Sequence, residues 1–165
     1  MDPESAIGGL RMLTGRSASG LPRRGRSARW YAGAMEQLVA VVVVVVREDR
    51  VLLMRRAAES EAGAGIWESV SGRVEPGEQP RDAAIREARE ETGLAVDVGE
   101  APVDAYAMER RGRPMIVLVY RGDAPAGEVR RSAEHDAHDW RAPEDALPRM
   151  PARLALAVRR ALAAR

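Results

Sequence analysis

Three glutamates crowd one face of an expected helix. The segment from Arg86 to Leu94 reads REAREETGL, which places Glu87, Glu90 and Glu91 at spacings of three and four residues. A helix turns by about 100° per residue, so these carboxylates share one face, where like charges repel. Two readings explain the arrangement: a solvated acidic face with arginine partners, or a set of oxygen ligands for a divalent cation such as Mg²⁺.

The residues before this helix extend the pattern. Gly72 is followed by five residues, Glu78, seven residues and then REAREETGL. This spacing resembles the signature of the Nudix hydrolases, which is G, five residues, E, seven residues and R-E-U-x-E-E-x-G-U, with U aliphatic. The matching positions are Gly72, Glu78, Arg86, Glu87, Glu90, Glu91, Gly93 and Leu94. Eight fixed positions make chance agreement very improbable, and the small apolar Ala88 stands at the first U position.

The resemblance implies a fold as well as a chemistry. Nudix hydrolases have a mixed β-sheet sandwiched between α-helices, an α/β (α+β) fold, and they hydrolyse a nucleoside diphosphate linked to another moiety using Mg²⁺ or Mn²⁺. By motif position, Glu87, Glu90 and Glu91 are the implied metal ligands, and Glu87 is alternatively the base that deprotonates water. Metal ions suit this reaction because they neutralise the anionic pyrophosphate and lower the pKa of a bound water.

Four further residues complete the implied site. Arg86 would orient the glutamates through a salt bridge, and Glu78 would brace the loop or join the metal ligands. Gly72 would let its backbone carbonyl approach the metal. Glu134 lies outside the signature, and we predict that it acts as a ligand or base from a loop across the site. The alternative for Glu134 is an ordinary surface residue.

Substrate choice lies outside the signature. The string WESVSGRVEPGE has Ser71 where the commoner family form has the first of two glycines, and with EHDAHDWRAPEDAL it resembles the bacterial dihydroneopterin triphosphate pyrophosphatases. We assign Trp67 and Arg73 to substrate binding, with Trp67 stacking on a base or pterin ring, although a lone strand tryptophan is more often a core residue. His135 and His138 are expected at the surface or beside the ligands, not as ligands themselves.

One domain must position these residues. Pro80 suits the first turn of a helix and Gly93 its end, which predicts a helix up to about Thr92 with a core stripe of Ala84, Ile85, Ala88 and Thr92. Apolar and β-branched runs predict strands at 37–46, 51–56, 66–72, 94–98, 103–109 and 115–121, and helices at 143–150 and 151–165. The first run lacks alternation, which is typical of a strand buried on both faces.

Composition excludes several classes of protein. The 165 residues contain no cysteine, so disulfides, thiolate metal sites and cysteine nucleophiles are absent. The apolar run LVAVVVVVV has nine residues, whereas a membrane-spanning helix needs about 20. No apolar stretch follows the first charges, so we expect no secretory signal and a cytoplasmic protein. Residues 36–165 carry 20 arginines and 23 acidic residues, a net charge of −3 that disfavours a nucleic-acid-binding domain.

The first 34 residues differ from the rest. They are rich in Arg, Ser and Gly without sustained periodicity, so we expect a disordered tail or a start codon assigned too early, followed by a Nudix domain over residues 35–165. Three functions compete: an active pyrophosphohydrolase, a nucleotide sensor without catalysis, and nucleic-acid binding through the arginine-rich tail. The expected partner is a nucleotide or pterin polyphosphate, with no membrane and no nucleic acid, and a homodimer stays open.

We predict that residues 1–34 are dispensable, because they lack the apolar periodicity needed to bury a face against the domain. A chain beginning at Met35 should keep the thermal midpoint and the turnover of the full-length chain, as measured by calorimetry and nucleotide hydrolysis. A large loss of either would show that the tail packs on the domain. A loss only of nucleic-acid affinity would favour the third function.

Overall fold

The computed structural model describes residues 37–59 and 63–164, so the predicted tail lies outside the described residues. The elements follow in the order β1 (Leu38–Arg47), β2 (Arg50–Arg56), β3 (Trp67–Glu68), β4 (Val70–Arg73), α1 (Pro80–Thr92), β5 (Asp97–Val98), β6 (Asp104–Arg110), β7 (Arg113–Asp123), β8 (His135–Arg141), α2 (Pro143–Ala146), a 3-10 turn (Leu147–Arg149) and α3 (Ala152–Ala163). Among these elements, no helix is long and apolar enough to cross a membrane.

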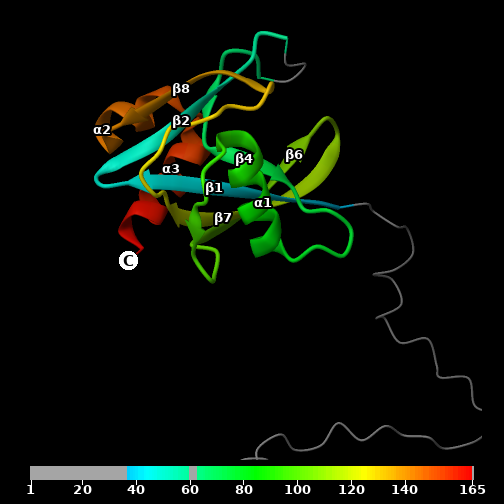
Figure 1. Cartoon of the computed structure of the whole chain (residues 1–165). Coiled ribbons are helices and arrows are strands. Elements are labelled where there is room, and N and C mark those ends of the chain that lie inside the picture. Colours follow the sequence, from blue (N-terminus) through cyan, green and yellow to red (C-terminus); the bar gives the residue numbers. More distant parts are fainter. Residues whose placement is uncertain (1–36, 60–62, 165) are drawn as a thin grey trace, which may run out of the picture. The chain divides into compact units, whose positions relative to one another are not determined.

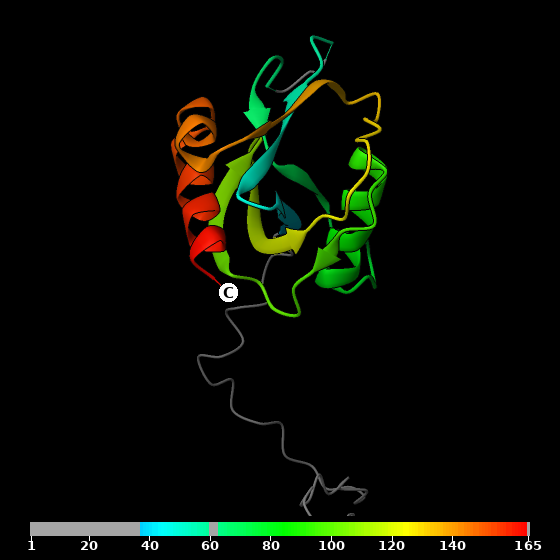
Figure 2. The same ribbon diagram turned by 60° about the vertical axis from the view of Figure 1, so that its left-hand side comes forward.

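The elements form three layers (Figures 1 and 2). An eight-stranded mixed sheet lies between α1 on one face and α2 and α3 on the other. Within the sheet, β1 and β7 run parallel over nine residue pairs, and the other pairings are antiparallel. The predicted mixed sheet sandwiched between helices is therefore confirmed.

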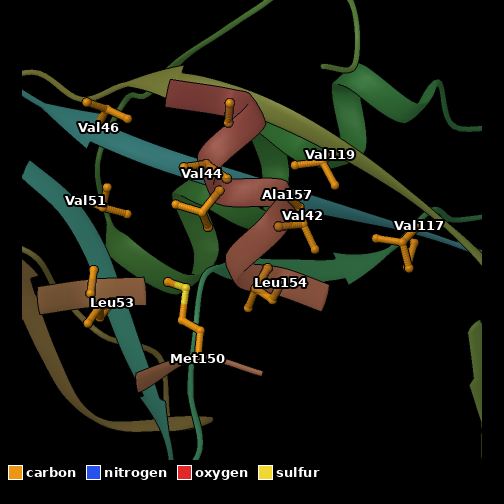
Figure 3. Close-up of a cluster of buried hydrophobic side chains, with 14 of the residues drawn as sticks. Val42, Val44, Val46, Val51, Leu53, Val117, Val119, Met150, Leu154 and Ala157 are labelled. Carbon is orange, nitrogen blue, oxygen red and sulfur yellow. The ribbon is translucent and has the colours of Figure 1, made fainter. Parts of the chain in front are cut away.

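The valine run forms the centre of the sheet. Every residue of β1 from Ala40 to Val46 is buried, as the absence of alternation predicts. Val42 and Val44 pack toward α3, as Figure 3 shows, while Val41 and Val43 pack toward α1. Full burial of each valine contributes about 1.5–3 kcal/mol, so this strand joins the two halves of the core.

The segment from 66 to 72, predicted as one strand, forms two. β3 pairs with β2 at Met54 and Arg55, whereas β4 pairs with β1 from Ala40 to Val43, and the break between them falls at Ser69. β1 and β2 are paired with each other only next to their turn, at Val46–Val51 and Arg47–Arg50. Because they diverge beyond it, one straight strand cannot pair with both. The break brings β4 under α1.

The structure differs from the sequence predictions at two other places. The sequence HDAHDWR lacks apolar alternation and does not predict β8, yet this strand pairs with β2 from Val51 to Arg56. In α1, Ile85 is 36% exposed and does not belong to the core stripe, whereas Ala83 is buried. The buried apolar residues of α1 are all small, Ala83, Ala84 and Ala88, which lets the helix approach the sheet closely.

We predict that Gly122→Ala destabilises the domain. A Cβ at Gly122 would lie 2.5 Å from Val96 Cγ1 and 3.1 Å from Val43 Cγ1, inside the packed core. Overpacking of this kind costs about 1–3 kcal/mol, measurable by urea unfolding. The matched control is Gly99→Ala, whose Cβ would meet no described atom closer than the 3.5 Å carbonyl oxygen of Arg121. Equal stabilities of the two variants would contradict this account of the packing.

Candidate active site

The loop before α1 is braced by a carboxylate. Glu78 accepts a hydrogen bond from the backbone N–H of Glu75 at 2.9 Å, and Arg86 donates to both of its oxygens at 2.9 and 3.0 Å. The bonds from Arg86, followed by the one from Glu75, lower the pKa of Glu78 to about 2. Glu78 is therefore ionised under ordinary conditions, and its geometry is that of the loop brace implied by the signature.

Arg86 connects that loop to the acidic face of α1. Its Nη1 donates to Glu87 Oε1 at 2.8 Å and to Glu90 Oε2 at 3.3 Å, while Nη2 also donates to the backbone oxygen of Arg73 at 3.0 Å. The hydrogen bond to Glu78 is the largest cause that raises the pKa of Arg86 above its already high value. The hydrogen bond to Glu87 and the charge of Glu87 raise it further. One fixed cation thus holds the loop, the helix and β4 together.

Gly72 forms a cradle for the Glu87 carboxylate. A Cβ at this position would lie 1.8 Å from both Glu87 Cδ and Oε1, so no other residue fits without moving the carboxylate. The Glu87 side chain is 14% exposed, and burial is the main cause that raises its pKa, against the lowering effect of Arg86. The invariant position of the signature therefore has a steric reason in this structure.

Glu91 is the most strongly perturbed acid of the site. It is 4% exposed, and among the described residues its Oε2 has no hydrogen-bond partner. Burial and then the charges of Glu68 and Glu87 raise its pKa to about 9, opposed by a hydrogen bond from the Ser71 backbone. His135 Nε2 lies 4.0 Å from Oε2. A cation bound next to such a buried carboxyl group would favour its ionised form and lower its pKa.

The other predicted ligands lie differently. Glu90 is 59% exposed and pairs with Arg86, and within residues 37–59 and 63–164 no three His, Asp or Glu side chains are placed to hold one metal ion. Glu134 lines the same cleft as Glu87 from the loop before β8, and its charge raises the pKa of Glu87 and Glu91. The structure therefore gathers Glu87, Glu91 and Glu134 in one region but does not preassemble a ligand set.

One polar residue near Glu91, Glu68, was missed by the sequence analysis. Glu68 on β3 forms an ion pair with Arg56 at 2.6 Å, and its Oε1 lies 3.4 Å from His135 Nε2. The imidazole of His135 is fully buried, so of the two expected positions it takes the one beside the ligands. The sequence offered one signal for Glu68: it stands in a predicted strand, four residues before Gly72. A carboxylate buried in a strand needs a partner, which would have suggested a polar site there.

Trp67 is not among the residues that line the cleft, so its stacking on a base stays a prediction. Side chains alternate along β3, so Glu68 faces the cleft while Trp67 packs against the core on the α3 side, near Arg55 and Arg149. The core alternative for this tryptophan therefore fits the structure. Arg73, by contrast, does line the cleft next to Gly72.

A wide cleft of about 1480 Å³ adjoins the glutamates. Arg56, Glu68, Gly72, Arg86, Glu87 and Glu134 belong to its polar part. The part formed by β1, the hairpin of β6 and β7, and the start of α3 combines apolar residues with arginines: Leu38, Ala40, Val42, Tyr106, Met115, Val117 and Leu154, and Arg110, Arg111, Arg113 and Arg153. Apolar walls with a few placed polar groups are typical of small-molecule sites.

The family model of the NUDIX domain matches residues 36–163. The chain belongs to the Nudix family. The resemblance drawn from the signature is thereby confirmed, and with it an enzyme that hydrolyses phosphoric anhydride bonds.

Individual Nudix proteins support this assignment. The CTP pyrophosphohydrolase of Escherichia coli (strain K12) is 38% identical over 125 residues, which cover 74% of this chain and 90% of that protein. The crystal structure of the MutT protein from Methanosarcina mazei Go1 has a TM-score of 0.70 at 26% identity, over 80% of this chain and 97% of the other. The E. coli dihydroneopterin triphosphate pyrophosphohydrolase has a TM-score of 0.58 at 22% identity, over 73% and 91% of the chains, a likeness of fold alone.

We predict that Glu91 makes the metal-free Nudix domain less stable as the pH rises. Folding raises the pKa of Glu91 from 4.5 to about 9, so the protonated carboxyl stabilises the fold fully below about pH 4.5, and this contribution is lost as the pH rises through about 9. At about pH 9 in EDTA, Glu91→Gln should be more stable than the wild type by about 1–3 kcal/mol.

Urea unfolding of both proteins between about pH 5 and pH 9 tests this expectation. The control is Glu90→Gln, which removes a mainly exposed charge from the same helix and should change the pH profile little. Parallel stability profiles for the wild type and Glu91→Gln would contradict the burial of a carboxylate that titrates in this window.

Proposed function

We propose that the protein is a Mg²⁺-dependent pyrophosphohydrolase that cleaves a nucleoside triphosphate, or dihydroneopterin triphosphate, by attack of water on phosphorus. The observation that carries the proposal is the buried Glu91, whose unpartnered oxygen lies in the same region as the Glu87 carboxylate cradled on Gly72. Such an arrangement is unfavourable in a purely structural role, because burial and the charges of Glu68 and Glu87 raise the pKa of Glu91.

The donor set fits a hard divalent cation. Glu87, Glu90 and Glu91 would hold the ion together with the Gly72 carbonyl, and Glu78 would keep the loop in place through Arg86. Oxygen-only donors with a surplus of negative charge are what Mg²⁺ and Mn²⁺ prefer. When bound, the ion supplies charge neutralisation for the pyrophosphate. Glu90 would first have to leave its 3.3 Å contact with Arg86.

Residues of this chain would accept the proton of the attacking water and bind the negative charge of the substrate. The oxygen of water forms a bond to phosphorus, the bridging P–O bond breaks, and two phosphate-containing products leave. Glu134 would take the proton of the attacking water, because it lines the same cleft as Glu87. Glu87 remains the alternative base, and Arg73 at the same cleft would bind a phosphate.

The competing sensor function is disfavoured by the same geometry. A protein that only binds a nucleotide has no need of a glycine cradle for one carboxylate and a buried, unpartnered second one. The similarity to a CTP pyrophosphohydrolase favours a nucleoside triphosphate, whereas the pterin substrate rests on short strings around Ser71 and Glu134.

We predict that the full-length chain releases pyrophosphate or phosphate from part of a panel of nucleoside triphosphates and dihydroneopterin triphosphate, in Mg²⁺ and not in EDTA. Glu134→Gln should lower kcat by at least about 10²-fold with little change in KM, because a general base contributes about 10²–10⁴-fold. Chromatographic separation of products measures both. Glu144→Gln, on an exposed position of α2, is the control.

Two outcomes would change the proposal. No turnover on any member of the panel, together with nucleotide binding, would establish the sensor function instead. An unchanged kcat for Glu134→Gln and a large loss for Glu87→Gln would transfer the role of base to Glu87.

A further inference from the structure

We propose that His135 is a positioning residue of the metal site, whose ring nitrogen Nε2 holds the carboxylates of Glu68 and Glu91 in a fixed arrangement. The inference rests on the proposed function, since it concerns how the proposed site binds its cation. The signature ends at Leu94, so it does not contain His135.

A bulge in β8 determines which way His135 faces. Arg55 pairs with Ala137, but the next residue of β2, Arg56, pairs with His135, so Asp136 is left without a partner in the register. Directly paired residues of antiparallel strands have their side chains on the same face of the sheet. A regular register would place the imidazole on the face of Ala137, whereas the bulge places it on the opposite face. Bulges are frequent beside active sites, where they re-aim a side chain.

The face that His135 takes is the one that α1 covers. Along β2, side chains alternate, so Arg56 lies on the same face as Met54, which packs in the core cluster with the alanines of α1. Glu68 pairs with Met54 and therefore lies on this face too. The bulge thus brings the imidazole to the side of the sheet where Glu68 and Glu91 already are.

The ring of His135 lies beside two acids from different elements. Its Nε2 is 3.4 Å from Glu68 Oε1, on β3, and 4.0 Å from Glu91 Oε2, on α1. Glu68 forms an ion pair with Arg56 at 2.6 Å, and an ionised carboxylate only accepts, so the hydrogen of the ring is on Nε2. The ring is fully buried, and packing limits its freedom to turn.

Such a donor is needed because the two carboxylates repel. After burial itself, the charge of Glu68 is the largest cause that raises the pKa of Glu91. Among the described residues, Glu91 Oε2 has no hydrogen-bond partner that would fix its direction. The Nε2–H of His135 reduces the repulsion and limits the directions that the two side chains can take. Groups that orient a metal ligand in this way typically change metal affinity by about 10- to 100-fold.

The backbone of the same residue fixes the loop that carries Glu134. The N–H of His135 donates to the Ser132 oxygen at 3.3 Å, and the N–H of Ser132 donates to the backbone oxygen of Glu91 at 3.3 Å. The N–H of Ala57, just after β2, donates to the backbone oxygen of Glu134 at 2.9 Å. A displaced imidazole would therefore disturb Glu134 as well as Glu91.

The chain contains a matched control. His138 is the second of its two histidines and lies on the same strand, where it pairs with Met54. Burial lowers the pKa of His138, and the charges that act on it next are those of Arg131 and Asp139. Among the described residues, His138 forms no hydrogen bond or ion pair with Glu68 or Glu91.

The test measures Mn²⁺ binding to the full-length protein by electron paramagnetic resonance. His135→Leu fills the buried site without a donor, and it should weaken Mn²⁺ binding by at least about 10-fold. His135→Gln places an amide nitrogen near the position of Nε2 and should recover most of the affinity. His138→Leu should bind Mn²⁺ as the wild type does.

A second measurement needs no substitution at His135, so it decides the question even if His135→Leu does not fold. Long-range ¹H–¹⁵N spectra report which nitrogen of each ring carries the hydrogen, and His138→Leu assigns the two rings. We expect hydrogen on Nε2 of His135, and a change in the signals of this ring, but not of the His138 ring, when Mg²⁺ is added. Hydrogen on Nδ1 of His135, or a ring that does not respond to saturating Mg²⁺, would overturn the inference.

The outcomes separate this inference from the proposed function. Equal Mn²⁺ affinity of His135→Leu and the wild type, or an equal loss in His138→Leu, defeats only the role of His135. The expected order of affinities without turnover of any nucleotide defeats only the hydrolase proposal. A wild type that binds neither Mn²⁺ nor Mg²⁺ defeats both.

Discussion

The buried carboxylate of Glu91 is the constraint on which the rest of the site depends. It lies among other acids, so its charged form is unfavourable in the metal-free protein, and its pKa rises to about 9. Three features of the surrounding structure bring Glu91 close to other carboxylates in spite of that repulsion. Gly72 leaves room for Glu87, the alanines of α1 let the helix approach β4, and the break at Ser69 places β4 there.

Fixed arginines limit the repulsion on both sides of Glu91. Arg86 neutralises Glu78 and part of Glu87 at the outer side, and Arg56 neutralises Glu68 behind it, next to the buried His135. Between these two cations, Oε2 of Glu91 has no hydrogen-bond partner among the residues that the structure describes. The locally unfavourable arrangement is offset by β1, whose residues from Ala40 to Val46 are buried and pack on both faces of the sheet.

Local signals made part of this structure predictable from sequence. Pro80 and Gly93 bound α1 at the predicted residues because helix ends depend on the backbone preferences of single residues, and the valine run predicted a doubly buried strand. The division into β3 and β4, the polar strand β8 and the side on which Trp67 lies depend on which distant strand each segment pairs with. The spacing of the glutamates predicted a shared face, but whether each is buried depends on contacts with Gly72, Ser71 and Glu68.

Direct binding of Mn²⁺ to Gly72→Ala, followed by electron paramagnetic resonance, tests most directly whether the cradle forms a metal site. The added methyl group must displace the Glu87 carboxylate, because its position lies 1.8 Å from Glu87 Cδ. The account predicts that the wild type and the Gly99→Ala control bind Mn²⁺ alike, while Gly72→Ala binds it at least about 10-fold more weakly, the loss typical of a disturbed ligand environment. Equal Mn²⁺ affinity of Gly72→Ala and the wild type, with both folded, would contradict it.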